Sequence, residues 1–125
     1  MSYKLIWMAL AGGLGTLARY WFAGMVQNAA GTFFPWGTAV VNLTGCLLFG
    51  LLVAVMEGRF AFSGETRAIL LVGFMGAFTT FSTFVFETEQ LLANSEWALA
   101  AGNLTLQNLV GIFALLLGLT LGRLI

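Results

Sequence analysis

The stretch GFMGAFTTFSTF, residues 73–84, decides how the rest of the chain is interpreted. It lies inside a long apolar segment, where a helix is expected, yet its twelve residues include two glycines, three threonines and a serine. Glycine and β-branched residues weaken a helix, and hydroxyl groups are costly in an apolar surrounding unless a partner binds them. The stretch therefore predicts a helix that breaks in its middle, with the freed groups buried in protein or lining a cavity.

The composition of the 125-residue chain is that of a membrane protein. Hydrophobic residues make up 60% of it and charged residues 8%, whereas roughly 25% of a soluble domain is charged. Five basic and five acidic residues leave no net charge, which argues against a nucleic-acid partner. The chain contains no histidine, the commonest general base, so we expect no enzyme activity.

Four apolar segments are each long enough to cross a bilayer, which takes about 20 residues. We place them at residues 5–25, 35–56, 68–92 and 97–122, in a single transmembrane domain over residues 1–125. The expected fold class is an all-α membrane protein with four transmembrane helices, the third of them broken mid-membrane. The connecting loops are too short to hold a soluble domain, so the function must lie within the membrane.

The basic residues predict how the chain sits in the membrane. Lys4, Arg59, Arg67 and Arg123 fall at the end that carries both termini, and Arg19 leans towards the other end. Cytoplasmic loops carry an excess of lysine and arginine. We therefore expect a multi-pass protein of the inner (plasma) membrane with cytoplasmic termini.

Polar side chains at membrane depth are the candidates for function. Thr38 and Asn42 share a helix face because they are four residues apart, and Asn103 and Gln107 do so for the same reason. No carboxylate lies near the centre of a span, and Glu87 comes closest. Neutral donors and phenylalanine ring edges favour a dehydrated anion, whereas carbonyls freed by the break could hold a small cation. These residues alone do not choose between the two ions.

Two other functions remain open. One is a small proton-coupled exporter, but such transport needs a carboxylate that loads and releases protons. Small multidrug exporters with four spans use a glutamate in the first span, and this chain has none there. The other is a non-transporting membrane scaffold, in which hydroxyls bond back to helix carbonyls and aromatic rings only pack.

Three motifs resemble those of the small dual-topology fluoride channels, the Fluc or CrcB family. In chain order they are GGLGTLARY at residues 12–20, GTAVVNLTG at residues 37–45 and GFMGAFTTFSTF at residues 73–84. Members of that family export fluoride passively and so lower its toxicity to the cell. The resemblance implies an antiparallel homodimer with two separate pores between the subunits, and we favour this dual topology despite the one-sided basic residues.

The resemblance also implies which residues line the fluoride pores. Phe81 and Phe84 would turn their ring edges towards the ion, and Asn42 would match the pore asparagine. In helix four many family members carry tyrosine and serine on the row that holds Asn103 and Gln107 here. The full set of pore candidates is Phe81, Phe84, Asn42, Thr38, Ser82, Thr83, Asn103 and Gln107, with Thr83 favoured over Ser82.

A structural sodium ion at the centre of the dimer is a further implication of the resemblance. The broken segment, taken as residues 76–80, would offer the backbone carbonyls of Gly76 and Thr79 from each chain. Arg19, which ends the first motif, would be structural or would attract anions towards a vestibule. On helix four, Asn108 is an alternative to the row that contains Gln107.

Overall fold

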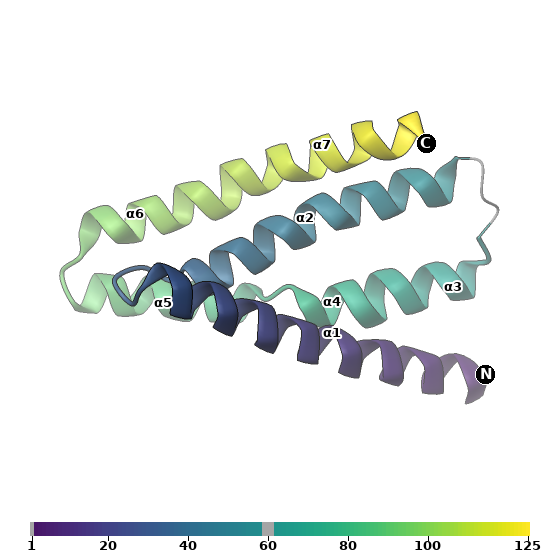
Figure 1. Cartoon of the computed structure of the whole chain (residues 1–125), viewed down its shortest axis with the longest axis horizontal. Helices are drawn as coiled ribbons and strands as arrows, with labels where there is room; N and C mark the ends of the chain where they lie inside the picture. The colour runs from purple at the N-terminus through teal and green to yellow at the C-terminus, as the bar shows by residue number, and fades with distance from the viewer. Residues whose placement is uncertain (1, 59–61) are drawn as a thin grey trace.

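The fold is an up-and-down arrangement of four long helical segments, seen in a computed structural model that describes residues 2–58 and 62–125, apart from the side chain of Ser2. Arg59 lies outside the described residues, so its expected place is not addressed. Figure 1 shows both termini at the same end of the bundle, as an even number of spans predicts. The elements are α1 (Ser2–Ala30), α2 (Trp36–Glu57), α3 (Gly64–Ala68), the π-helical segment η1 (Ile69–Met75), α4 (Gly76–Phe78), α5 (Phe81–Ala93), α6 (Trp97–Thr105), the π-helical segment η2 (Leu106–Val110) and α7 (Gly111–Leu124).

Three of the long helical segments are apolar and long enough to cross a membrane: Trp36–Glu57, Gly64–Ala93 and Trp97–Leu124. The first segment, α1, has 29 residues but is not among these three. The prediction of an all-helical membrane protein is confirmed. Many large apolar side chains on these helices are exposed in the single chain, as expected for surfaces that face lipid or another subunit.

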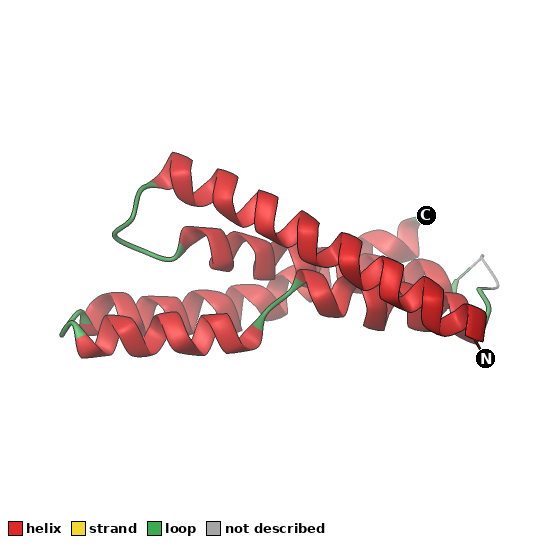
Figure 2. Ribbon diagram, turned by 90° about the horizontal axis from the view of Figure 1, so that it is seen from below, coloured by secondary structure: helices red, strands yellow, loops and turns green. Residues whose placement is uncertain are grey.

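The third helical segment is broken between α4 and α5. Thr79 and Thr80 there have extended backbone dihedral angles, with ψ of 158° and 115°. Figure 2 shows this break as a loop between two helical parts. The predicted extent of 76–80 is wrong at its start, because Gly76–Phe78 remains helical. Gly76 has φ of −62° and its N–H donates to the carbonyl of Leu71, so the helix absorbs this glycine without opening.

Close backbone approaches hold the helices together. A Cβ added to Gly50 of α2 would overlap the Leu115 carbonyl of α7, and one added to Gly118 of α7 would overlap the Leu47 carbonyl of α2. The contact is therefore reciprocal, and it depends on a missing side chain on both helices. Gly15 brings α1 equally close to η1. Small residues allow such approaches where lipid gives no hydrophobic drive for association.

The core lies beside the break. Its buried members are Val41, Met75 and Phe78, so α2 packs against both η1 and α4 at this level. Phe78 also stacks on Phe22 of α1, with ring centroids 6.5 Å apart. The residues on either side of the break are thus fixed by packing, while the two threonines between them are not helical.

The reciprocal glycine contact predicts opposite effects for two glycine-to-alanine substitutions. Gly118→Ala forces α2 and α7 apart and should lower the free energy of unfolding by about 1–3 kcal/mol. Gly102→Ala on α6 meets nothing within 4 Å and should raise it by up to about 1 kcal/mol, because alanine is the better helix former. Thermal unfolding of both variants in detergent measures the difference, and equal melting temperatures would contradict this packing.

Candidate functional site at the broken helix

Asn42 of α2 pairs with both backbone groups of Thr80 in the break. The Thr80 N–H donates to Asn42 Oδ1 at 2.8 Å, and Asn42 Nδ2 donates to the Thr80 carbonyl at 3.0 Å. Backbone groups without a helical partner are costly at membrane depth. One amide side chain therefore satisfies the Thr80 N–H that the break frees and also bonds the Thr80 carbonyl, which explains why an asparagine faces this point.

A relay of side-chain hydrogen bonds continues from Asn42. Asn42 Nδ2 also donates to Gln107 Oε1 at 2.7 Å, and Gln107 Nε2 donates to Asn103 Oδ1 at 2.8 Å. Asn103 Nδ2 then donates to the Thr88 hydroxyl at 2.9 Å, and that hydroxyl donates to the Phe84 carbonyl at 2.8 Å. We call this chain of bonds the amide relay. It starts at Thr80 and returns to the same helical segment at Thr88 and Phe84.

The first groove beside the break has a volume of about 270 Å³. We call it the phenylalanine groove, because Phe81 and Phe84 line it together with Asn42 and Gln107. Phe81 is 75% exposed and Phe84 only 5%. Their ring centroids lie 5.7 Å apart with the planes tilted by 55°, so the two rings are not stacked face to face. The remaining lining residues are Gly45, Cys46, Phe49, Thr79, Thr80, Asn108 and Leu115.

A second groove lies on the other side of Thr80 and contains an acid. We call it the carboxylate groove; Arg19, Thr38, Thr83 and Glu87 line it. The Thr38 hydroxyl donates to Glu87 Oε1 at 2.7 Å. The other carboxyl oxygen, Oε2, is buried and has no hydrogen-bond partner among the described residues. A further groove towards the α1–α2 loop shares Glu87 with this one, so the region near the break continues to that end of the bundle.

Arg19 reaches the break itself. Its Nη1 donates to the Thr79 carbonyl at 3.3 Å, so the side chain lies at the middle of the bundle and not in a loop. On the other side of the break, the Thr83 N–H donates to Thr80 Oγ1 at 3.3 Å instead of to the Thr79 carbonyl. Arg19 therefore takes the place of a helix amide for Thr79, which agrees with the structural role considered for it.

The predicted pore residues divide between the two grooves. Thr38 and Asn42 share a face of α2, yet Thr38 lines the carboxylate groove and Asn42 the phenylalanine groove. Asn103 is fully buried and lines neither; it serves the relay instead. Ser82 is exposed and lines neither groove, whereas Thr83 lines the carboxylate groove. Thr38 and Asn42, which the sequence places on one helix face, thus line two different grooves.

The sequence predicts a break that includes Thr80 and names Glu87 as the carboxylate closest to the centre of a span, but it does not predict the part that these two residues and Thr88 play in the site. Thr88 completes the amide relay, Thr80 forms its other end, and Glu87 places a carboxyl group near the break. Glu87 was set aside because it is near the end of the third span. A helical count from Thr83 would have found it, since residues four apart share a face. For Thr88 the sequence holds no signal, because its partner Asn103 belongs to a different helix.

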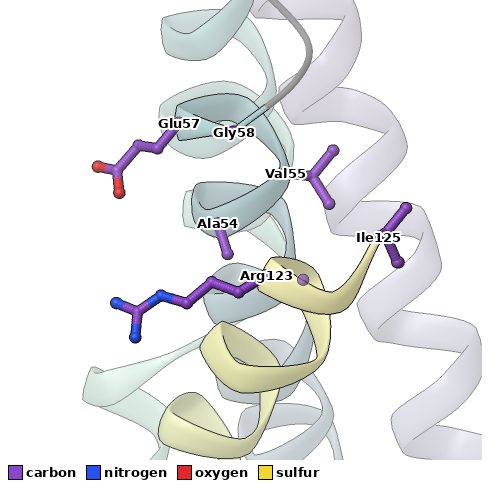
Figure 3. Close-up of a pocket in the computed structure, with 7 residues that line it drawn as sticks. Ala54, Val55, Glu57, Gly58, Arg123 and Ile125 are labelled. Atoms are coloured by element: carbon purple, nitrogen blue, oxygen red, sulfur yellow. The ribbon is translucent and has the colours of Figure 1, made fainter.

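A third region of note lies far from the break, at the end of the bundle with the termini. Figure 3 shows a groove between the ends of α2 and α7, with the side chains of Glu57 and Arg123 extending from it on one side. Arg67 Nη2 lies 3.6 Å from Glu57 Oε1, and both side chains are partly exposed. None of the predicted site residues lines this groove.

Fold and site together define a small multi-pass helical membrane protein with polar grooves at a broken helix. The family described as "CrcB-like protein, Camphor Resistance (CrcB)" matches residues 6–119. The chain therefore belongs to the CrcB family, as its motifs indicated.

Relatives of known name cover the whole chain. The protein named "Fluoride-specific ion channel FluC" from Desulforapulum autotrophicum is 55% identical over 100% of both chains. Proteins of the same name from Nitrosococcus oceani and Solidesulfovibrio magneticus are 55% and 54% identical, again over 100% of both chains. These relatives carry the name of ion channels and not of enzymes.

The pairing of Asn42 with Thr80 predicts a large effect of one substitution on stability. Asn42→Ala leaves the N–H of Thr80 and the Oε1 of Gln107 without partners, which should lower the free energy of unfolding by about 2–5 kcal/mol. Asn108→Ala is the matched control, since among the described residues Asn108 Nδ2 bonds only to the Leu104 carbonyl of its own helical segment. The control should change stability by less than about 0.5 kcal/mol. Thermal unfolding in detergent measures both, and similar losses would refute the special role of Asn42.

Proposed function

We propose that this chain is a fluoride-specific ion channel of the plasma membrane, which lets fluoride leave the cell passively and so lowers its toxicity. The observation that carries the proposal is the phenylalanine groove, in which neutral amide groups and phenylalanine rings meet at a broken helix with no carboxylate in the lining. The name and full-length identity of the FluC relatives support it. Fluoride is the ion of those relatives' name.

The chemistry of the phenylalanine groove suits a small anion. Fluoride is strongly hydrated, so a narrow path must replace its water with hydrogen-bond donors. Amide N–H groups donate, and the edge of a phenyl ring carries partial positive charge. Phe81 is the more exposed of the two rings and presents its surface to the open side of the groove. A larger anion such as chloride is excluded by width, and cations are disfavoured by a lining of donors.

We propose that the functional unit is an antiparallel homodimer in the lipid bilayer, with two pores between the subunits. The exposure of Phe81 supports this, because a ring that lines an ion path through a membrane needs a wall opposite to it. A second copy would supply that wall for each groove. Fluoride, a second copy of the chain and the lipid bilayer are then the partners of the protein.

We also propose that a structural sodium ion binds at the centre of this dimer, through the carbonyls of Gly76 and Thr79 from each chain. The donor set fits such an ion in two respects. The Thr80 N–H, which would bond the Gly76 carbonyl in an unbroken helix, donates to Asn42 instead. Gly76 is also exposed, so its carbonyl is open to a partner subunit. Arg19 occupies one side of the Thr79 carbonyl, which still has a second lone pair to offer.

One observation favours a second candidate, the proton-coupled exporter. Glu87 has a buried carboxyl oxygen without a partner and lines two of the grooves. Carboxylates of this kind carry protons in transporters. The two candidates differ in whether fluoride movement needs a proton gradient, and a non-transporting scaffold would move no ion at all.

Fluoride efflux from liposomes tests the proposal. Vesicles with the purified protein are loaded with potassium fluoride, valinomycin sets the voltage, and a fluoride electrode follows the external ion. We expect efflux without a pH gradient and no matching efflux of chloride. Phe81→Ile should abolish it, whereas Phe86→Ile should not, because Phe86 is exposed on the same helix and lines neither groove.

The outcomes of this experiment are distinct. Efflux that requires a pH gradient would favour the exporter, and no efflux would leave only the scaffold. Full efflux through the Phe81 variant would show that the ring has no part in the pore. Size-exclusion chromatography with light scattering checks that both variants keep the oligomeric state of the parent protein.

The sodium proposal predicts a dependence of flux on the cation present. Protein purified and reconstituted with N-methyl-D-glucamine in place of sodium should lose its fluoride efflux, because the ion that joins the freed carbonyls is absent. Restoring sodium chloride to the same sample should restore the efflux. Unchanged efflux after exhaustive removal of sodium would rule out a required ion at Gly76 and Thr79.

A further inference from the structure

The amide relay has groups of fixed character at its two ends. The Thr80 N–H can only donate, so it is Asn42 Oδ1, at 2.8 Å, that must face it. The Phe84 carbonyl can only accept, so the Thr88 hydroxyl uses its one proton there, at 2.8 Å. Thr88 Oγ1 is therefore left as an acceptor for whatever lies beside it.

Each amide between these ends has one possible orientation. Asn103 donates to Thr88 and so turns its Oδ1 to Gln107, which must donate in turn. Gln107 then offers its Oε1 to Asn42. Both ends of the relay require that donation runs from Asn42 through Gln107 and Asn103 to Thr88. Because the two ends agree, this direction is definite. A reversal at any point would set two donors or two acceptors against each other.

The direction of the relay decides which amide is free to bind an ion. Asn42 has two N–H bonds, and both are used, one by the Thr80 carbonyl and one by Gln107 Oε1. Gln107 uses one Nε2–H for Asn103. Its second N–H has no protein partner among the described residues, and Gln107 lines the phenylalanine groove.

We propose that Thr88 is a positioning residue for the phenylalanine groove: its hydroxyl accepts from Asn103 and holds the amide relay at this end, as Thr80 does at the other, so that Gln107 and not Asn42 presents a free N–H to the ion. The proposal rests on the proposed function only for the identity of that ion. The two ends of the relay bond the third helical segment at Thr80 and at Phe84. They therefore also hold the helical turn between them, which carries Phe81.

Thr88→Val tests this role, because valine keeps the shape and removes the hydroxyl. Asn103 is fully buried, so its amide would lose its acceptor, and the oxygen that accepts from Gln107 Nε2 would no longer be held in place from this end. We expect fluoride efflux to fall about tenfold or more. Thr88→Ser, which keeps the hydroxyl, should restore most of it.

Thr120→Val is the matched control. The Thr120 hydroxyl donates to the Leu116 carbonyl of its own helix at 2.9 Å, as Thr88 does to Phe84, but it accepts no bond from another side chain. Efflux through the control should equal that of the parent protein. Equal efflux through the parent and the Thr88→Val variant, or an equal loss in both valine variants, would overturn the positioning role.

A double variant separates positioning from folding. Thr88→Val with Asn103→Leu removes both partners and leaves no buried donor unpaired between them, so it should fold better than Thr88→Val alone while its efflux stays low. Full efflux through the double variant would overturn the proposal.

Melting temperatures of the parent, of Thr88→Val, of Asn103→Leu and of the double variant give a readout that needs no fluoride. If the stability loss of the double variant differs from the sum of the two single losses, the Thr88–Asn103 bond of the relay is supported. If the losses add, that bond is contradicted. If the parent protein itself shows no efflux, the proposed function fails, and this cycle still decides the relay.

Discussion

The structure depends on one constraint, the need to satisfy a backbone that leaves its helix inside an apolar bundle. The N–H of Thr80 has no helical partner, and the side chain of Asn42 pairs with this N–H and also with the Thr80 carbonyl. Without this pairing the break would expose polar groups that lipid cannot satisfy. The carbonyls of Gly76 and Thr79 lack their helical partners because the amides that would normally bond them donate elsewhere, and Arg19 donates to the Thr79 carbonyl in their place. The bonds that stabilise the break are therefore the same ones that leave these carbonyls without a helical amide.

Much of the fold was predictable from the sequence, because apolar length and small residues are local signals. The helices, the position of the break and the common end of the termini all follow from residues read in order. The extent of the break was not predictable, since Gly76 is helical only through the bond of its N–H to Leu71. The assignment of side chains to grooves was also out of reach. Thr38 and Asn42 share a face of α2, and their separation depends on where Thr80 passes between them.

The two grooves differ in chemistry although Thr80 lines both. One offers amides and phenylalanine rings, and the other holds Glu87 and Arg19. In the sequence the polar residues form rows on separate helices, and nothing in it assigns Glu87 to either groove. With the relay in place, most of those amides serve one another. The number of polar residues along a membrane helix therefore sets only an upper limit on the donors that an ion can contact. The hydrogen bonds among these residues decide how many donors are left for the ion.

The π-helical segment η2 has a consequence for how the fourth helical segment tolerates change in length. Each residue of an α-helix turns it by about 100°, and a π-helical turn holds one extra residue. The segment lies between Asn103, which serves the relay, and Gly118, which packs against α2. Loss of a single residue from η2 would convert the turn to α-helix and rotate these two faces relative to each other. A relative with a one-residue deletion in this segment would therefore keep the helix but not the relative orientation of its two faces.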